Sequence, residues 1–151
     1  MTQPDPVEAY DRFEKAYLTQ KYKSKKPTMP EITEVALWLM RSLLGEEGER
    51  HVAEHPWLRS HIVTARGKGL SGQQPGKRLI AGMGLAALGN ALSRRTLPAS
   101  FQRVVFASQE ATPLSPLLDD FATRYVDLSK ANVFNALMAS GAIPYVFEGV
   151  Y

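Results

Sequence analysis

The sequence contains no cysteine among its 151 residues. Disulfide bonds, thiolate nucleophiles and cysteine-ligated zinc sites are therefore excluded. Long apolar runs are also missing: the longest, residues 79–92, has 14 residues, fewer than the roughly 18 that a membrane-spanning helix needs. The first ten residues lack the basic and apolar regions of a secretory signal. These absences predict a soluble protein, cytoplasmic or peripheral to a membrane, and no motif in it requires a cofactor.

Excess charge of either sign is small, with a net charge of +3 and 22% charged residues. A nucleic-acid-binding domain would show a stronger basic excess and one of the usual motifs, so this class is not expected. The basic residues do cluster around a glycine-rich loop at residues 66–78 and in the stretch KYKSKK. Such clusters occur in solvated turns and also beside anionic lipid headgroups. The candidate headgroup contacts in KYKSKK are Lys21, Lys23, Lys25 and Lys26.

Residues 1–58 are predicted to be mainly helical. Apolar residues at steps of three and four predict an amphipathic helix over about residues 6–21. Thr28 and Glu31 form a T-x-x-E capping box with Pro30 between them, which predicts the start of a second helix. Gly45 is the expected end of that helix.

Residues 59–151 show an α/β pattern, and the whole chain is expected to form one domain. Short strands are predicted at residues 61–65, 102–107, 123–128 and 142–151, with a long helix at about 76–95. A short helix is expected after Pro116, and Ser129 is expected to cap another. The order strand, helix, strand over the first two strands predicts a crossover between parallel strands.

The glycine-rich loop resembles two catalytic motifs without satisfying either. A phosphate-binding P-loop has the spacing G-x-x-x-x-G-K-[ST], but Gly72 is one residue too close to Gly76, and Arg78 replaces the hydroxyl. A nucleophile elbow has the pattern G-x-S-x-G, but Gln73 follows Ser71 where the second glycine should be. Ser71 is therefore interpreted as an ordinary loop residue.

The stretch HVAEH matches the zinc-peptidase pattern H-x-x-E-H, in which two histidines bind zinc and the glutamate acts as a base. The candidate metal site is therefore His51, Glu54 and His55. Pro56 disfavours helical geometry at the residue before it, so the second histidine is expected at a frayed helix end. A charged surface helix is the simpler interpretation.

A longer match covers residues 123–150, TRYVDLSKANVFNALMASGAIPYVFEGV. This stretch resembles the later half of the patatin-like phospholipase family, in which a strand leads into a helix of the pattern N-x-x-x-A-L-x-A-S-x-S-I-P and then into a strand through P-x-x-F. Ala142 departs from the pattern, because serine is usual at its place. The matching residues are Asn132, Ala136, Leu137, Ala139, Ser140, Ile143, Pro144 and Phe147.

The resemblance implies a three-layer α/β fold and hydrolysis of lipid esters by a Ser-Asp dyad, as in phospholipase A-type enzymes. This chain contains neither G-x-S-x-G nor D-G-[GA], so no catalytic residue is assigned. By position in the family, the oxyanion loop and the serine would precede Met1 and the aspartate would follow Tyr151. The expectation is an incomplete patatin-like domain, inactive alone, in which Ser140, Pro144 and Phe147 shape the substrate pocket.

The end of the chain carries a further expectation. An interrupted strand at residues 142–151 would leave unpaired backbone groups, so self-association or binding of missing segments is expected, with Val146 or Phe147 in the contact. Two classes of protein stay open besides the lipid hydrolase. One is a zinc metallopeptidase, which needs HVAEH on a regular helix and a third ligand.

The other is a non-catalytic membrane-surface or protein-interaction module that uses the helix at 6–21 and the KYKSKK lysines.

Overall fold

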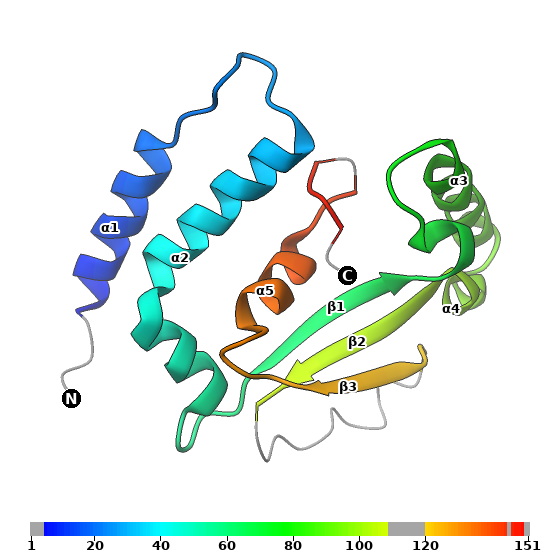
Figure 1. Ribbon diagram of the computed structural model, residues 1–151. Helices are drawn as coiled ribbons and strands as arrows, with labels where there is room; N and C mark the ends of the chain where they lie inside the picture. The colour runs from blue at the N-terminus through cyan, green and yellow to red at the C-terminus, as the bar shows by residue number, and fades with distance from the viewer. Residues whose placement is uncertain (1–4, 109–119, 145, 150–151) are drawn as a thin grey trace.

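The computed structural model describes residues 5–108, 120–144 and 146–149 (Figure 1). The fold is mixed α/β and rich in helix, which confirms this part of the prediction. Within these residues, no helix combines the length and the apolar character needed to cross a bilayer. The elements in chain order are α1 (Pro6–Thr19), α2 (Met29–Glu54), β1 (His61–Gly67), the 3-10 turn η1 (Gly69–Gly72), α3 (Lys77–Leu92), the 3-10 turn η2 (Arg94–Thr96), α4 (Leu97–Ser100), β2 (Phe101–Ala107), β3 (Thr123–Asp127) and α5 (Val133–Gly141).

The helix α1 begins where its sequence predicts. Pro6 occupies the first turn, and the Asp5 carboxylate accepts a hydrogen bond of 2.9 Å from the backbone N–H of Val7. An acidic cap at this position satisfies one of the free N–H groups of the first turn. The helix lies against α2, and the side chain of Ala16 is buried.

The helix α2 also begins at the predicted place, but the capping box is not formed. The Thr28 side chain makes no cap bond, and the Glu31 carboxylate accepts instead from the backbone N–H of Lys23. Gly45 has φ 58° and ψ −178°, so the helical backbone is interrupted there, but the helix does not end at Gly45 as predicted. The helix then resumes and continues to Glu54, because a single glycine in this conformation redirects the chain without preventing another turn.

The sheet has the order β1-β2-β3 in the described residues, with β1 antiparallel to β2 and β2 parallel to β3. The predicted crossover between the first two strands is therefore wrong. The helix α3 packs on η1, η2 and α4, beyond the carboxyl end of β1 (Figure 1). Because the chain reverses through these short turns, β2 returns alongside β1 in the opposite direction.

The core lies between the sheet and α5. Alternate residues of β1, Ile62 and Thr64, are buried, and Ile62 belongs to a cluster with residues of the β3–α5 region. In Figure 1, α5 lies beside the sheet, α2 beside α5, and α1 on the outside. The buried members of the cluster are Ile62, Leu128, Val133 and Ala136, with Val52, Phe106, Phe134 and Leu137 packed against them.

The prediction of a fourth strand at residues 142–151 is wrong for the described part of this stretch. The backbone N–H groups of Val146 and Phe147 both donate to the carbonyl of Ile143, at 3.0 and 3.1 Å, which closes a turn. A single bridge joins Pro144 to Phe147. Proline has no N–H for a strand ladder, so the local turn prevails over the strand preference of the neighbouring side chains. The short helix expected after Pro116 lies outside the described residues.

Gly45 and Gly84 offer a matched pair of glycine substitutions. A Cβ atom would meet no heavy atom within 4 Å at either position, but only Gly45 has a positive φ, 58°. We expect Gly45→Ala to lower the free energy of unfolding by about 1–3 kcal/mol, since this backbone region is almost confined to glycine. Gly84→Ala, inside α3, should raise it by about 0.5–1 kcal/mol. Urea unfolding followed by circular dichroism measures both, and effects of the same sign would contradict the assigned kink.

Candidate functional site

The connection between β3 and α5 is held by Asn132. Its Oδ1 accepts from the backbone N–H of Ser129 and its Nδ2 donates to the carbonyl of Asp127, both at 2.8 Å. The helix begins at Val133, whose N–H donates to the carbonyl of Ser129 at 2.9 Å. The expected side-chain cap at Ser129 is therefore replaced by a side-chain clamp from Asn132, one of the residues that carries the family resemblance.

Ser140, Pro144 and Phe147 lie at the far end of the same segment. Ser140 is exposed on the last turn of α5, and Pro144 and Phe147 are paired across the turn that follows. The backbone N–H of Glu148 donates to the hydroxyl of Thr33 on α2 at 3.0 Å. The three predicted pocket residues therefore lie at the end of α5 and in the turn that follows it. The bond from Glu148 to Thr33 connects this turn to α2.

A shallow hollow of about 340 Å³ lies elsewhere, between the end of α1 and α2. It contains none of Ser140, Pro144 and Phe147. Its lining brings together one carboxylate, one ammonium group and the hydroxyl of Thr19, but no serine. The Thr19 hydroxyl donates to the backbone carbonyl of Lys15 at 2.7 Å, so it caps the end of α1. The lining residues are Thr19, Gln20, Lys21, Glu34, Val35 and Trp38.

The KYKSKK lysines form an exposed turn between α1 and α2. The Nζ atom of Lys23 lies 3.9 Å from the Glu34 carboxylate, and its backbone N–H is bonded to Glu31. Both acidic partners belong to α2. This turn is therefore partly neutralised by its own neighbour, which weakens its attraction for an anionic headgroup.

The glycine-rich loop is folded into η1 and an extended approach to α3. The N–H of Ser71 donates to the carbonyl of Lys68 at 3.1 Å, and Ser71 lies inside η1. The ammonium group of Lys68 donates to the carbonyl of Pro98 at 2.7 Å. Ser71 is thus placed in a local turn away from the start of α3, whereas a nucleophile elbow leads directly from strand to helix.

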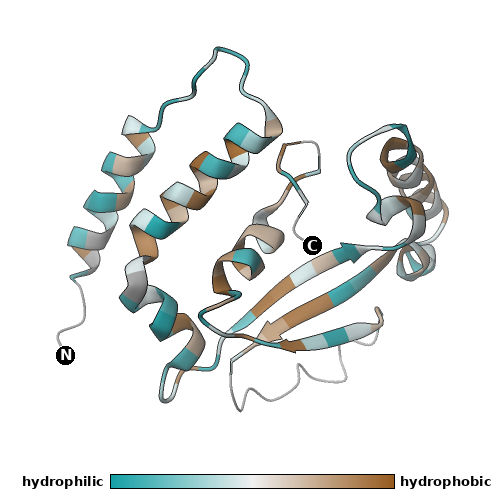
Figure 2. Ribbon diagram, viewed as in Figure 1, coloured by the Kyte–Doolittle hydropathy of each residue, from teal (hydrophilic) through white to brown (hydrophobic). Residues whose placement is uncertain are grey.

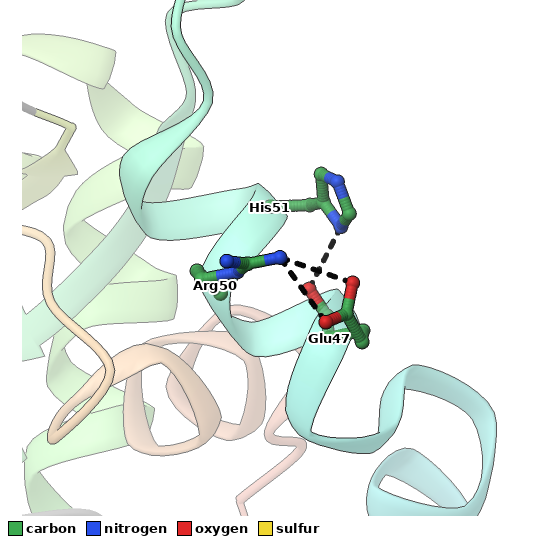
Figure 3. A network of polar contacts seen from close by, with 3 residues as sticks. All are labelled: Glu47, Arg50 and His51. Carbon is green, nitrogen blue, oxygen red and sulfur yellow. Dashed lines mark hydrogen bonds and ion pairs between the residues drawn. The ribbon is translucent and has the colours of Figure 1, made fainter. Parts of the chain in front are cut away.

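His51 lies on the last turns of α2, in the contacts drawn in Figure 3. Its Nδ1 donates to the carbonyl of Glu47 at 2.8 Å, and Arg50 contacts both carboxylate oxygens of Glu47 at 3.1 Å. These bonds belong to a charged helix surface. No three side chains of the metal-ligating types come together in the described residues.

His55 does not continue the helix. The helix ends at Glu54, and His55 has φ −62° and ψ 133°, as the following proline predicts. Its Nδ1 accepts from the backbone N–H of Leu58 at 3.0 Å. A neutral ring that accepts at Nδ1 carries its proton on Nε2, whereas a zinc ligand must present an unprotonated nitrogen. HVAEH therefore lacks the regular helical pair that the zinc motif requires.

Arg103 makes a contact that the sequence pattern did not indicate. Its guanidinium lies 2.6 Å from the Asp120 carboxylate and 5.4 Å from the centre of the Phe121 ring. Only 13% of the Arg103 side chain is exposed. The pair joins β2 to the residues that lead into β3, so it is structural. No periodicity could have shown it, because the partners are 17 residues apart and one lies outside any strand.

Comparisons with protein-family models, with curated proteins and with solved structures find no match. The function is therefore inferred from the residues and their geometry.

The clamp at Asn132 predicts a clear difference between two asparagines of one segment. Asn132→Ala removes both hydrogen bonds of the β3–α5 connection and should lower the free energy of unfolding by about 1–2 kcal/mol. Asn135→Ala, at an exposed position of α5, should change it by less than about 0.5 kcal/mol. Urea titration of both variants tests this, and equal stabilities would show that the clamp does not hold the connection.

The geometry of His55 predicts that HVAEH binds no zinc tightly. After incubation with zinc and dialysis, the chain should retain well under one equivalent by elemental analysis. The double variant His51→Ala, His55→Ala should retain the same amount. Stoichiometric zinc in the native chain that is lost in the double variant would refute the assignment of this stretch as a charged surface helix.

Proposed function

We propose that this chain supplies the helix-and-turn wall of a patatin-like lipid acyl hydrolase, a three-layer α/β fold that hydrolyses carboxylic esters of lipids. The observation that carries the proposal is the match over residues 123–150. The resemblance lies in the residue types at matching positions, and the local geometry gives several of these residues a structural role.

Asn132 is the first of these residues. A residue that both donates and accepts is needed to close the β3–α5 connection, and Asn132 makes the two bonds with one side chain. Ala136 is a second such residue. Its side chain is fully buried in the core cluster between α5 and the sheet. A larger side chain at that position would force the helix away from the sheet.

The end of α5 provides the pocket-shaping residues. Ala139 is half-buried and Ser140 exposed on the last turn, and the helix stops at Gly141. An isolated backbone bridge then pairs Pro144 with Phe147. In the proposed enzyme this end lies close to the reacting ester, where Ser140, Pro144 and Phe147 contact the acyl chain and take no part in proton transfer.

The chemistry requires groups that this sequence does not contain. Ester hydrolysis by a Ser-Asp dyad needs an activated serine, a base within hydrogen-bond reach and preplaced oxyanion donors. No serine here lies in G-x-S-x-G and no aspartate lies in D-G-[GA]. The proposed activity therefore belongs to a polypeptide or complex that adds these motifs to the present residues.

Association with the elements that carry these motifs remains part of the proposal, on changed grounds. The turn at residues 143–147 removes the reason for pairing through an interrupted strand there. Val146 is 37% exposed and Phe147 is half-buried. Side-chain contacts at this turn, rather than a β-ladder, are the proposed means by which added segments join the fold.

The coding sequence that adjoins this chain provides the first test. An in-frame G-x-S-x-G upstream and D-G-[GA] downstream are expected. The polypeptide that spans all three should hydrolyse a nitrophenyl ester of a fatty acid, and the present chain alone should not. Phe147→Ala in the spanning polypeptide should raise KM for long-chain esters several-fold with little change in kcat, because its proposed contact is with the acyl chain. Ala142→Ser, which restores the usual family residue, serves as the matched control.

Two results would overturn the proposal. One is an open reading frame that extends on both sides without either motif. The other is ester hydrolysis by the present chain that disappears when Ser71 or Ser140 is replaced by alanine.

A further inference from the structure

The outward face of α3 carries large apolar side chains from Ile80 to Leu92. From Leu79 to Ser93 the sequence carries no charged residue, and α3, at the right of Figure 2, is drawn largely in brown and pale colours. A helix that is apolar all round is normally covered on every side. The large side chains left in solvent are Ile80 (59% exposed), Leu85 (62%), Leu88 (66%) and Leu92 (89%).

The opposite face of α3 is already occupied. Leu79, Gly82 and Ala86 are the buried residues of the helix, which packs against η1, η2 and α4. A Cβ atom at Gly82 would lie 2.6 Å from the carbonyl carbon of Leu70, so only glycine permits this approach. The close contact fixes the rotation of α3, and the exposed leucines cannot turn inward to replace the buried residues.

The charged residues on α3 and next to it in the chain are all basic. Between Glu54 and Glu110 the sequence has eight basic residues and no acidic residue. Lys77 and Arg78 open α3, and Arg94 and Arg95 form η2 directly after its end. All four are exposed. An apolar strip is therefore bounded at both ends by positive charge.

We propose that α3 docks on the surface of an anionic lipid bilayer. The helix lies in the plane of the interface, with Ile80, Leu85, Leu88 and Leu92 among the upper acyl carbons and the basic pairs at its two ends among the phosphates. Its 16 residues span about 24 Å, less than the roughly 30 Å of a hydrocarbon core, so it lies on the membrane rather than across it.

The charge distribution selects a lipid surface as the occupant. A second copy of this chain would bring the same basic pairs toward each other, which is electrostatically unfavourable. An anionic bilayer provides negative charge around an apolar interior, which matches the arrangement on α3 in both respects.

The helix α1 shows why apolar exposure alone is insufficient. Val7 is 65% exposed and Leu18 is 72% exposed, much as on α3. However, Asp11 and Glu14 are spaced by four or seven residues from both, so they share that side of the helix. Negative charge beside the apolar residues opposes binding to an anionic surface, so α1 is a matched control within the same molecule.

The absence of cysteine makes a site-specific probe possible. Leu88→Cys and Leu18→Cys each create one thiol, which is labelled with an environment-sensitive nitrobenzoxadiazole dye. The full chain is mixed with vesicles of phosphatidylcholine alone or with about 30% phosphatidylglycerol. The label at position 88 should brighten and shift to the blue with the anionic vesicles only, and the label at position 18 should not respond.

Vesicle sedimentation measures separately how much the basic residues and the apolar side chains contribute to membrane binding. Arg94→Gln with Arg95→Gln should lower the partition coefficient about 30-fold at low ionic strength, roughly fivefold for each charge. Leu85→Gln with Leu88→Gln should lower it about tenfold or more. Val7→Gln with Leu18→Gln on α1 should leave it unchanged, and 0.5 M salt should weaken the binding of the native chain.

Three outcomes would overturn the inference. The first is an absence of binding to anionic vesicles by the folded native chain. The second is equal binding to both vesicle types, unaffected by the arginine changes. The third is a response of the label at position 88 to protein concentration without lipid, which would assign the face to a second copy. None of these measurements involves ester hydrolysis, so the inference can fail or hold independently of the proposed enzyme function.

Discussion

The contact between α5 and β1 joins the parts of the described structure. On one side, α5 packs against β1 through Ile62 and Val133, and on the other it packs against α2. The helical pair α1–α2 reaches the sheet through this helix and through Val52 near the end of α2. Without α5, the sheet face would expose its apolar residues to water, at roughly 25 cal/mol for each Å² left uncovered.

Because α5 has this central position, the residues at its two ends are placed with little freedom. Asn132 fixes where the helix starts relative to β3, and the bond from Glu148 to Thr33 ties the following turn to α2. A helix held at both ends and packed along its length is a suitable support for side chains that must shape a pocket. This is why the same segment carries both the core of the fold and the proposed pocket wall.

The helix starts could be predicted from the sequence, since they depend on nearby residues. Pro6 lies in the first turn of α1, α2 begins directly after Thr28, and Gly45 marks the kink inside α2. The strands β1, β2 and β3 were likewise recognisable from their β-branched runs.

The direction of strand pairing was not predictable, because it depends on where the chain goes between the strands. The close approach of α3 to η1 allows the antiparallel return of β2, and this approach depends on a missing Cβ at Gly82 that no periodicity reveals. The prediction of a strand in the C-terminal stretch is wrong for a related reason. Its valine and phenylalanine favour a strand, but the backbone bonds to Ile143 are local and form a turn.

The candidate site shows the same division between local and distant information. The frayed position of His55 follows from the adjacent Pro56, so the weakness of the zinc motif could be predicted. The function of Asn132 as a clamp follows from bonds three and five residues away that only the folded connection defines. The Arg103–Asp120 pair is more distant still and had no signal in the sequence.

The placement of α5 also has a consequence for the order of folding. The helices α1 and α2 are neighbours in the chain, so their contact closes only a short loop. The contact of Val133 with Ile62 closes a loop of roughly 70 residues, which carries a larger entropic cost before any favourable burial is gained. During synthesis α1 and α2 emerge before the sheet. The apolar face of β1 stays uncovered until α5, the last helix of the described residues, has been made. Until α5 arrives, that face is the surface most in need of protection from wrong partners.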